Sequence, residues 1–182
     1  GFVKVNNIIS PESSEKFSKK ILSLIKNDRP VFSKMRGCSW GLYKPPFLEE
    51  VSSELKPLME EISEVKLLST YWFTTIYTNN SYLNIHTDRP SCEFSLSLNL
   101  KSDIDWPLFF KDPNNVEHEF ITEVGSGIAY LGCQRPHWRL PLISKNKQLF
   151  IQTFFHYVNA DGPYKSFEND HNRPYKKISL KK

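Results

Sequence analysis

The amino-acid sequence predicts a mainly β fold, an antiparallel sandwich or jelly roll with helices packed against the outside of one sheet. Two observations lead to this prediction. Before Lys66, apolar residues recur at the spacing of amphipathic helices. From Lys66 onward, short segments rich in β-branched and aromatic residues follow one another with turn residues between them. Because no helical pattern interrupts these later segments, the strands are expected to pair antiparallel instead of forming βαβ units.

Two helices are expected in the N-terminal third. The first begins with Ser10 as N-cap and Pro11 at the first helical position. The second covers "PPFLEEVSSELKPLMEEISEV", where Pro57 is expected to kink the helix or split it in two. The apolar positions at helical spacing are Phe17, Ile21, Leu24 and Ile25 in the first helix, and Leu48, Val51, Leu55, Leu58 and Ile62 in the second.

Six to eight short strands are expected to form the β core. They are indicated by alternating apolar residues and by loop sequences such as "TNNS", "DPNN" and "GSG". The clearest strand segments are "KLLSTYWFTTIYT", "CEFSLSLNL", "PLFFKD", "GIAYLG" and "QLFIQTFFHYV".

A chain of 182 residues, 39% of them hydrophobic, fits one domain better than two. We expect that domain to span residues 1–162, with helices over about 10–65 and the β core over about 66–159. Residues 163–182 are expected to form a basic C-terminal tail. Without this tail the rest of the chain is roughly neutral, because residues 172–182 contain lysines and one arginine but no acid. A solvated terminus is favoured over a nucleic-acid partner.

Three cysteines, Cys38, Cys92 and Cys133, lack both the CxxC spacing of a zinc site and the density of a disulfide scaffold. A reducing, cytoplasmic compartment is therefore expected. The sequence shows neither a signal peptide nor an apolar run long enough for a membrane span, and it gives no indication of oligomeric state.

The segment "SYLNIHTDRPSCEFSLSLNL" places His86 and Asp88 where the neighbouring residues predict a strand. On a strand, residues i and i+2 project from the same face with Cα atoms about 6.6 Å apart, so both side chains can reach one ion. His137 in "GIAYLGCQRPHWRLPL" supplies a third candidate ligand from a separate strand. Two imidazoles and one carboxylate with open positions are the ligand set of non-haem Fe(II) oxygenases, whereas a structural zinc site would close its shell.

These residues resemble the iron(II)- and 2-oxoglutarate-dependent dioxygenases, particularly the compact prolyl-4-hydroxylase-like branch. The resemblance rests on His-x-Asp followed after about fifty residues by His, within a β region preceded by helices. It covers about residues 66–159 and is most detailed around "YTNNSYLNIHTDRPSCEFSLSLNL" and "LGCQRPHWRLPL". It implies a double-stranded β-helix, of the jelly-roll or cupin-like kind, buttressed by two or three helices.

The resemblance also implies cofactors and their ligands. Fe(II) would be held by His86, Asp88 and His137, 2-oxoglutarate and O2 would be co-substrates, and ascorbate would be an optional stimulant. Two residues compete for the distal carboxylate of 2-oxoglutarate. Lys147 lies ten positions beyond His137, where the branch carries its basic residue, and Arg139 lies two positions beyond. Arg139 is favoured slightly because its guanidinium binds a carboxylate bidentately and because "SKNKQ" resembles an exposed turn.

Further pocket residues are suggested by their positions on the strands. The resemblance makes Tyr77 the candidate for a hydrogen bond to the co-substrate, because related enzymes carry a tyrosine on this strand, and Tyr82 is its local competitor. For both tyrosines, packing in the core or at the pocket rim is the favoured alternative. Ser97 and Asn99 alternate with leucines and either line the co-substrate pocket or face water. Gln152 could be a buried polar group near the site. The remaining residues considered are His156, expected as a hydrogen-bonded core histidine, Trp138, expected to point away from iron, Arg89, expected at the surface or cavity mouth, and His118 and His171, which receive no role.

The expected reaction is hydroxylation of an unactivated C–H bond coupled to decarboxylation of 2-oxoglutarate to succinate. By the resemblance, a prolyl or other residue of a peptide is the first substrate class, and a free amino acid or other small molecule is the second. Two alternatives remain open: a non-catalytic β-sandwich binding module, and a cupin-like metal enzyme without 2-oxoglutarate. The basic residues near His137 argue against the second alternative.

Overall fold

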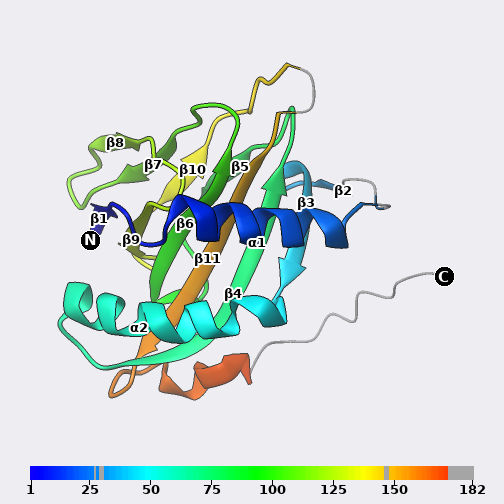
Figure 1. Ribbon diagram of the computed structural model, residues 1–182. Helices are drawn as coiled ribbons and strands as arrows, with labels where there is room; N and C mark the ends of the chain where they lie inside the picture. The colour runs from blue at the N-terminus through cyan, green and yellow to red at the C-terminus, as the bar shows by residue number, and fades with distance from the viewer. Residues whose placement is uncertain (27, 29–30, 146–147, 172–182) are drawn as a thin grey trace.

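The computed structural model in Figure 1 describes residues 1–26, 28, 31–145 and 148–171. The helices are α1 (Pro11–Leu24) and α2 (Glu49–Ser63), with short 3₁₀ turns η1 (Pro46–Leu48), η2 (Pro90–Cys92) and η3 (Lys165–Asp170). The strands are β1 (Phe2–Val5), β2 (Val31–Ser33), β3 (Gly37–Tyr43), β4 (Leu67–Tyr77), β5 (Leu83–His86), β6 (Phe94–Ser102), β7 (Leu108–Lys111), β8 (Glu117–Phe120), β9 (Gly127–Leu131), β10 (His137–Arg139) and β11 (Phe150–Asn159).

These strands form two antiparallel sheets. The larger has seven strands in the order β1-β9-β6-β11-β4-β3-β2, and the smaller has four in the order β5-β10-β7-β8. Every pairing among the described strands is antiparallel. The predicted mainly β, jelly-roll fold with external helices is confirmed.

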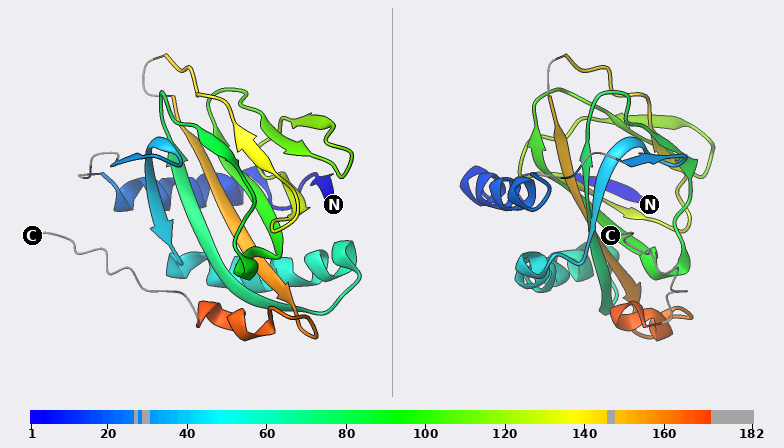
Figure 2. Two further views of the ribbon diagram at one scale, coloured as in Figure 1. Left: turned by 180° about the vertical axis from the view of Figure 1, so that it is seen from behind. Right: turned by 90° about the vertical axis from the view of Figure 1, so that its right-hand side faces the viewer.

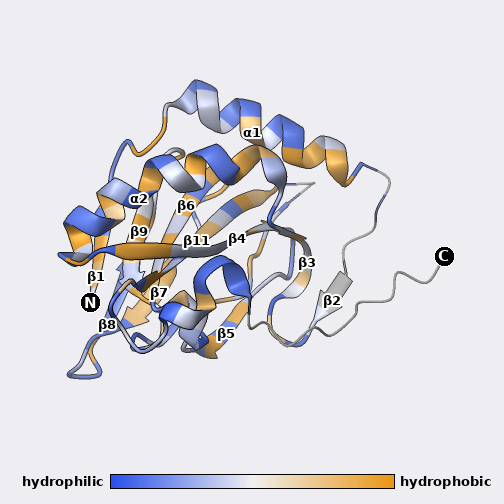
Figure 3. Cartoon of the chain, turned by 90° about the horizontal axis from the view of Figure 1, so that it is seen from below, coloured by the Kyte–Doolittle hydropathy of each residue, from blue (hydrophilic) through white to orange (hydrophobic). Residues whose placement is uncertain are grey.

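Both helices lie on one side of the large sheet, and the small sheet lies on the other side (Figure 2, right). Each helix combines hydrophilic and hydrophobic residues along its length (Figure 3). Ile21 of α1 and Leu55 and Met59 of α2 are buried in the core against leucines of β6. As predicted, Ser10 caps α1, since its Oγ accepts a hydrogen bond from the N–H of Ser13 at 3.1 Å.

Helix α2 continues through Pro57, so the expected split is not observed. Pro57 is exposed, while Val51 and Leu55 before it and Met59 after it are buried. Proline removes one hydrogen bond from the helix. Burial of apolar side chains on both sides of the proline offsets this loss.

Three strands were not predicted. Strands β1, β2 and β3 all lie before residue 66, in the part expected to be helical beyond residue 10. Strand β3 extends the large sheet by pairing with β4 from Ser39 opposite Tyr77 to Tyr43 opposite Phe73. Its sequence, "GCSWGLY", contains two glycines, which lower strand propensity, so tertiary pairing and not local preference determines this strand.

The side chains of strand β6 alternate between the two sides of the large sheet. Leu96, Leu98 and Leu100 face the helices and belong to the main hydrophobic core. The alternating residues Ser97 and Asn99 are fully buried on the opposite side, so they do not face water. Polar side chains therefore line the space between the two sheets.

The first part of the expected C-terminal tail contains a short helical segment. Residues 165–170 form η3, which packs against β4 and the end of β11. The buried Asp170 carboxylate accepts two hydrogen bonds from Nη2 of Arg89, at 2.8 and 3.0 Å, and one from the Tyr43 hydroxyl at 2.7 Å. The basic residues 172–182 lie outside the described residues, and the assignment of a single domain stays a prediction. None of the described helices is long and apolar enough to cross a membrane.

Candidate active site

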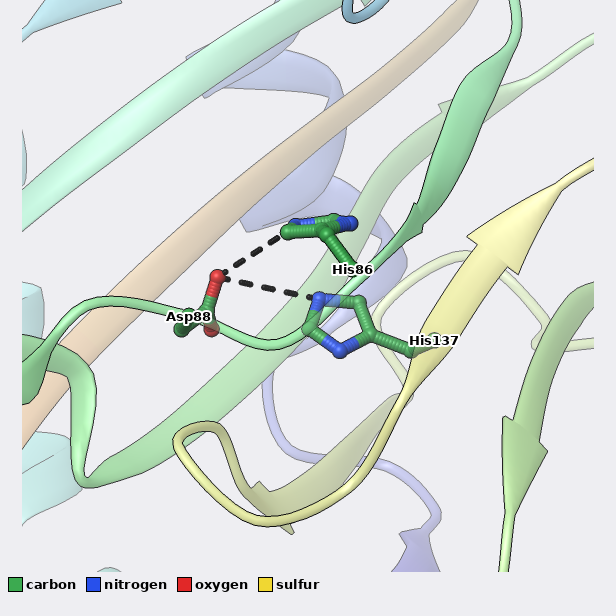
Figure 4. A group of neighbouring side chains, drawn as sticks. All are labelled: His86, Asp88 and His137. Carbon is green, nitrogen blue, oxygen red and sulfur yellow. Dashed lines mark ion pairs between the residues drawn. The ribbon is translucent and has the colours of Figure 1, made fainter.

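The small sheet brings the three candidate metal ligands together. His86 is the last residue of β5 and His137 is the first of β10, and the antiparallel register places them opposite each other. Asp88 follows β5 by two residues, and its N–H donates to the carbonyl oxygen of Gly132 at 2.8 Å. Figure 4 shows both imidazole rings turned toward the Asp88 carboxylate.

The distances are short enough for all three side chains to share one ion. Oδ1 of Asp88 lies 3.4 Å from Nε2 of His86 and 3.8 Å from Nε2 of His137. The two imidazole ring centres are 4.2 Å apart. One possible donor atom from each residue can be chosen such that all lie within 4.8 Å of one another.

Main-chain carbonyls fix which imidazole nitrogen faces the carboxylate. Nδ1 of His86 is 2.8 Å from the Asn84 carbonyl oxygen, and Nδ1 of His137 is 2.9 Å from the Arg135 carbonyl oxygen. A carbonyl oxygen only accepts, so each Nδ1 carries the proton and each neutral ring leaves the Nε2 lone pair available. This is the arrangement by which proteins orient metal-binding histidines.

The electrostatic surroundings favour an ionised Asp88 and a neutral His137. Burial acts to raise the Asp88 pKa, but the His86 hydrogen bond and neighbouring histidines hold it below the usual value. Burial lowers the pKa of His137. Burial also acts to lower the pKa of His86, yet the bond to Asp88 raises it overall. One carboxylate and two imidazoles are then available to a divalent metal ion.

Gly132 leaves room for the Asp88 carboxylate. A Cβ at this position would lie 2.2 Å from the Cys92 carbonyl oxygen and 2.6 Å from Oδ2 of Asp88. Because the nearest atom is a main-chain oxygen, a side chain at position 132 would force the loop itself to shift.

Gly132→Ala is therefore expected to weaken metal binding by at least about tenfold, the scale of changes around metal ligands. Titration of Co(II) into the apoprotein, followed by its visible absorption, measures the affinity. Gly162→Ala, whose added Cβ meets atoms of Asn159 in the turn after β11, is the control. Unchanged Co(II) affinity in Gly132→Ala would contradict this account.

A cavity of about 380 Å³ opens beside the three ligands, between the two sheets. Its wall follows one face of β4, on which every second residue from Tyr71 to Tyr77 points inward. The residues that line it are Met35, Arg36, Tyr71, Phe73, Thr75, Tyr77, Leu83, His86, Asp88, Tyr130, His137, Phe154 and His156.

Arg139 is a buried cation without an acidic partner among the described residues. Its guanidinium carbon packs against the rings of both Trp106 and Phe150, 4.4 and 4.6 Å from their centres. It donates to the Trp106 carbonyl oxygen and to Oε1 of Gln152, while its Nε has no hydrogen-bond partner among the described residues. Burial lowers the Arg139 pKa to about 10. A buried charge of this kind is costly unless an anion binds it.

Two further predicted pocket residues lie near Arg139. The Tyr77 hydroxyl is fully buried close to Thr75 and has no partner at hydrogen-bond distance among the described residues, and burial raises its pKa. Ser97 is linked to Arg139 indirectly, because its Oγ accepts from the Gln152 amide that also contacts the guanidinium. Both roles in co-substrate binding stay predictions.

Five other candidates do not line the cavity: Tyr82, Trp138, Arg89, His118 and His171. Lys147 lies outside the described residues. Tyr82 lines a groove on the outer side of the small sheet, and Trp138, which faces that groove, stacks on Phe109. Arg89 pairs with Asp170 instead of remaining a free surface arginine. His118 pairs with Asp112 at 3.2 Å, and His171 is exposed.

His156 is a hydrogen-bonded core histidine, as expected, although it also lines the cavity. Its Nδ1 lies 2.8 Å from Oγ of Ser95, and burial lowers its pKa from 6.5 to about 4. Between these two pH values the unfolded chain binds a proton that the native protein does not, so the free energy of unfolding decreases as the pH falls. From pH 7 to pH 5 the expected loss is about 2 kcal/mol.

Urea unfolding at both pH values, with EDTA present, measures this loss in the free energy of unfolding. His156→Gln should remove the part of the loss that comes from His156. An identical pH dependence in His156→Gln would contradict the assignment.

Comparison with known proteins identifies the fold. No protein-family model matches the sequence, and neither does any curated protein. Among solved structures, a Pseudomonas putida prolyl-4-hydroxylase matches with a TM-score of 0.64 at 15% identity, over 86% of this chain and 92% of that chain. The chain has the fold of the Fe(II)- and 2-oxoglutarate-dependent oxygenases. The predicted resemblance is confirmed at the level of the fold.

Two other structures share this oxygenase fold. The viral collagen prolyl hydroxylase of Paramecium bursaria Chlorella virus-1, in complex with 2-oxoglutarate, matches with a TM-score of 0.61 at 14% identity, over 86% of this chain and 96% of that chain. SnoK, a non-heme α-ketoglutarate-dependent carbocyclase from nogalamycin biosynthesis, matches with a TM-score of 0.72 at 10% identity, over 88% of this chain and 80% of that chain.

Within this oxygenase fold, sequence reasoning missed several residues of the site. Arg36 lies in a segment without helical or strand periodicity, so nothing marked it as a cavity residue. Tyr130, whose hydroxyl is 3.5 Å from Oδ2 of Asp88, resembled an ordinary strand tyrosine. The glycine in "YLGCQ" was the one available signal for Gly132, because an isolated glycine after a strand often marks a close approach.

Proposed function

We propose that the protein is an Fe(II)- and 2-oxoglutarate-dependent oxygenase that hydroxylates an unactivated C–H bond. The observation that carries this proposal is the convergence of His86, Asp88 and His137 inside the oxygenase fold. Both Nε2 atoms face the one carboxylate, which is the donor set of non-haem Fe(II) sites.

His86, Asp88 and His137 would hold the iron. With 2-oxoglutarate bound, Fe(II) would activate O2, the oxidant, so that one oxygen atom goes to the substrate C–H bond and the other to the succinate formed with carbon dioxide from 2-oxoglutarate. The main-chain carbonyls of Asn84 and Arg135 keep the imidazoles neutral and oriented. The side chains of His137 and Asp88 are 2% and 15% exposed, so these two side chains are largely shielded from bulk water.

The surroundings of Arg139 fit 2-oxoglutarate. Its Nε and the hydroxyl of Tyr77 are two buried donors without acceptors among the described residues, and an anion with carboxylate oxygens would satisfy both. Arg139 would bind the distal carboxylate, with Gln152 holding the guanidinium and Ser97 holding Gln152. Lys147 is the alternative anchor.

The substrate belongs to one of two classes. The likeness to two prolyl hydroxylases supports a prolyl or other residue in a peptide. The likeness to SnoK supports a small molecule.

Succinate formation from 2-oxoglutarate tests the oxygenase. The assay contains Fe(II), ascorbate and O2 without added substrate, and compares wild type with His86→Ala and with His118→Ala as control. Slow turnover in wild type and His118→Ala, lost in His86→Ala, is expected. Absence of turnover, together with no 2-oxoglutarate-dependent visible absorption in the anaerobic ferrous protein, would instead support a non-catalytic binding module.

A further inference from the structure

A second arginine, Arg36, lines the same cavity as the metal ligands. Its guanidinium carbon lies 4.7 Å from the centre of the Phe73 ring, and its Nη1 donates to Oγ1 of Thr75 at 3.3 Å. A guanidinium has five N–H donors, and this is the one side-chain hydrogen bond that Arg36 makes to the described residues. The described residues contain no acid paired with it.

The turn that carries Arg36 is fixed to the strand that carries His86. The carbonyl oxygens of Arg36 and Met35 accept hydrogen bonds from the N–H groups of Tyr82 and Asn84, both at 3.1 Å. The Asn84 carbonyl in turn accepts from Nδ1 of His86. Main-chain bonds therefore set the position of Arg36 relative to the metal ligands.

A glycine allows this close approach. Gly37 has a φ of +65°, and a Cβ there would lie 2.5 Å from the Asn80 carbonyl oxygen. The turn can pack against the loop between β4 and β5 because this position has no side chain. The arginine is thus held at the cavity by the fold and not by an ion pair.

Among the described residues, the cavity lining has one arginine without an ion pair and no acid other than Asp88. Asp88 is the single acid among the described residues that line it, and it is the proposed iron ligand. The remaining surface beside Arg36 is largely aromatic and aliphatic, with Phe73, Phe154 and Met35 nearby in the lining. Such a site favours a molecule with a negative group and an apolar body over a zwitterion or a cation.

Arg36 and Arg139 differ in their surroundings. Arg139 is 3% exposed and packs against Trp106 and Phe150, and it does not line the cavity directly. Arg36 is half-buried and lies on the cavity wall. Two cations in two environments are suited to two different carboxylates, one on the co-substrate and one on the substrate.

We propose that Arg36 binds a carboxylate of the substrate and so selects acidic substrates. The inference rests on the proposed oxygenase function and narrows its substrate class. The carboxylate could belong to a small organic acid or to an acidic side chain in a peptide, since both offer the same bidentate acceptor.

Paired probes test this inference. The first pair is 3-phenylpropanoate and its amide, and the second is N-acetyl-aspartate amide and N-acetyl-asparagine amide. Calorimetry measures their binding to the anaerobic Fe(II) protein with saturating 2-oxoglutarate, for wild type, Arg36→Gln, Arg36→Lys and the control Lys34→Gln. At least one acid should bind at least about tenfold more tightly than its amide, and Arg36→Gln should remove that preference.

The outcomes separate the alternatives. Arg36→Lys is expected to recover part of the preference for acids, and Lys34→Gln is expected to bind like wild type. The pair with the larger difference between acid and amide identifies the source of the carboxylate. Acids that bind no better than amides, or a preference that survives in Arg36→Gln, would overturn the inference, as would a weakened affinity for 2-oxoglutarate in Arg36→Gln in place of the effect on acids.

Failure of the oxygenase proposal is detected separately. In that case the wild type lacks the 2-oxoglutarate-dependent absorption. The same acid and amide titrations into the protein without metal or co-substrate then decide the role of Arg36, with the same supporting and overturning results.

Discussion

Replacing His137 with alanine is expected to reduce succinate formation by more than about a hundredfold. Even partners behind a metal ligand contribute about ten- to a hundredfold to metal affinity or activity, so removal of a ligand should cost more. His137 is also the least exposed of the three ligands, so little water can reach its position. Succinate formation and Fe(II) affinity, measured on the same preparations, provide the test.

The control is His118→Ala, which removes a histidine from the outer β7–β8 hairpin. Circular dichroism of both variants should show an intact fold. If His137→Ala retains turnover while remaining folded, the assignment of the metal ligands is wrong.

Arg139→Met is expected to raise the 2-oxoglutarate concentration needed for half-maximal turnover by at least about tenfold. Methionine preserves much of the apolar packing against Trp106 and Phe150 but removes the charge-assisted bonds to a carboxylate, each worth about 1.5–3 kcal/mol. Without co-substrate the same change should leave the free energy of unfolding unchanged or raised, because the wild-type cation is buried without an acid.

Lys147→Ala separates the two candidate anchors. If Arg139 binds the distal carboxylate, this variant should require about the same 2-oxoglutarate concentration as wild type. The reverse pattern, with a large effect in Lys147→Ala and little in Arg139→Met, would identify Lys147 as the anchor. Titration of 2-oxoglutarate against succinate formation and urea unfolding of each variant provide both measurements.

The sequence was most informative where local chemistry determines structure. Ser10 and Pro11 mark the start of α1 because capping and proline geometry depend on few neighbours. The alternation of leucine with serine and asparagine in β6 reports two different buried environments. The His-x-Asp spacing could be recognised because two residues apart on an extended chain face the same side.

The features of the fold and the site that the sequence did not predict depend on contacts between distant parts of the chain. Strand β3 exists because β4 offers it a partner, and its glycine-containing sequence gives little strand signal. The supports of the two imidazoles are main-chain carbonyls, which every residue possesses, so no sequence pattern marks them. Arg36 enters the cavity through the packing of a turn, and the letters around it predict no element.

The pairing of Asp170 with Arg89 ties the end of the described chain to the loop that follows the metal ligands. Arg89 is the immediate neighbour of Asp88, and the Asp170 side chain is fully buried. A protein shortened to residues 1–162 would leave this arginine without its acid and the Tyr43 hydroxyl without one of its acceptors. The point at which the chain is cut for expression is therefore expected to affect the position of Asp88 and, with it, the affinity for the proposed Fe(II), even though no candidate ligand is removed.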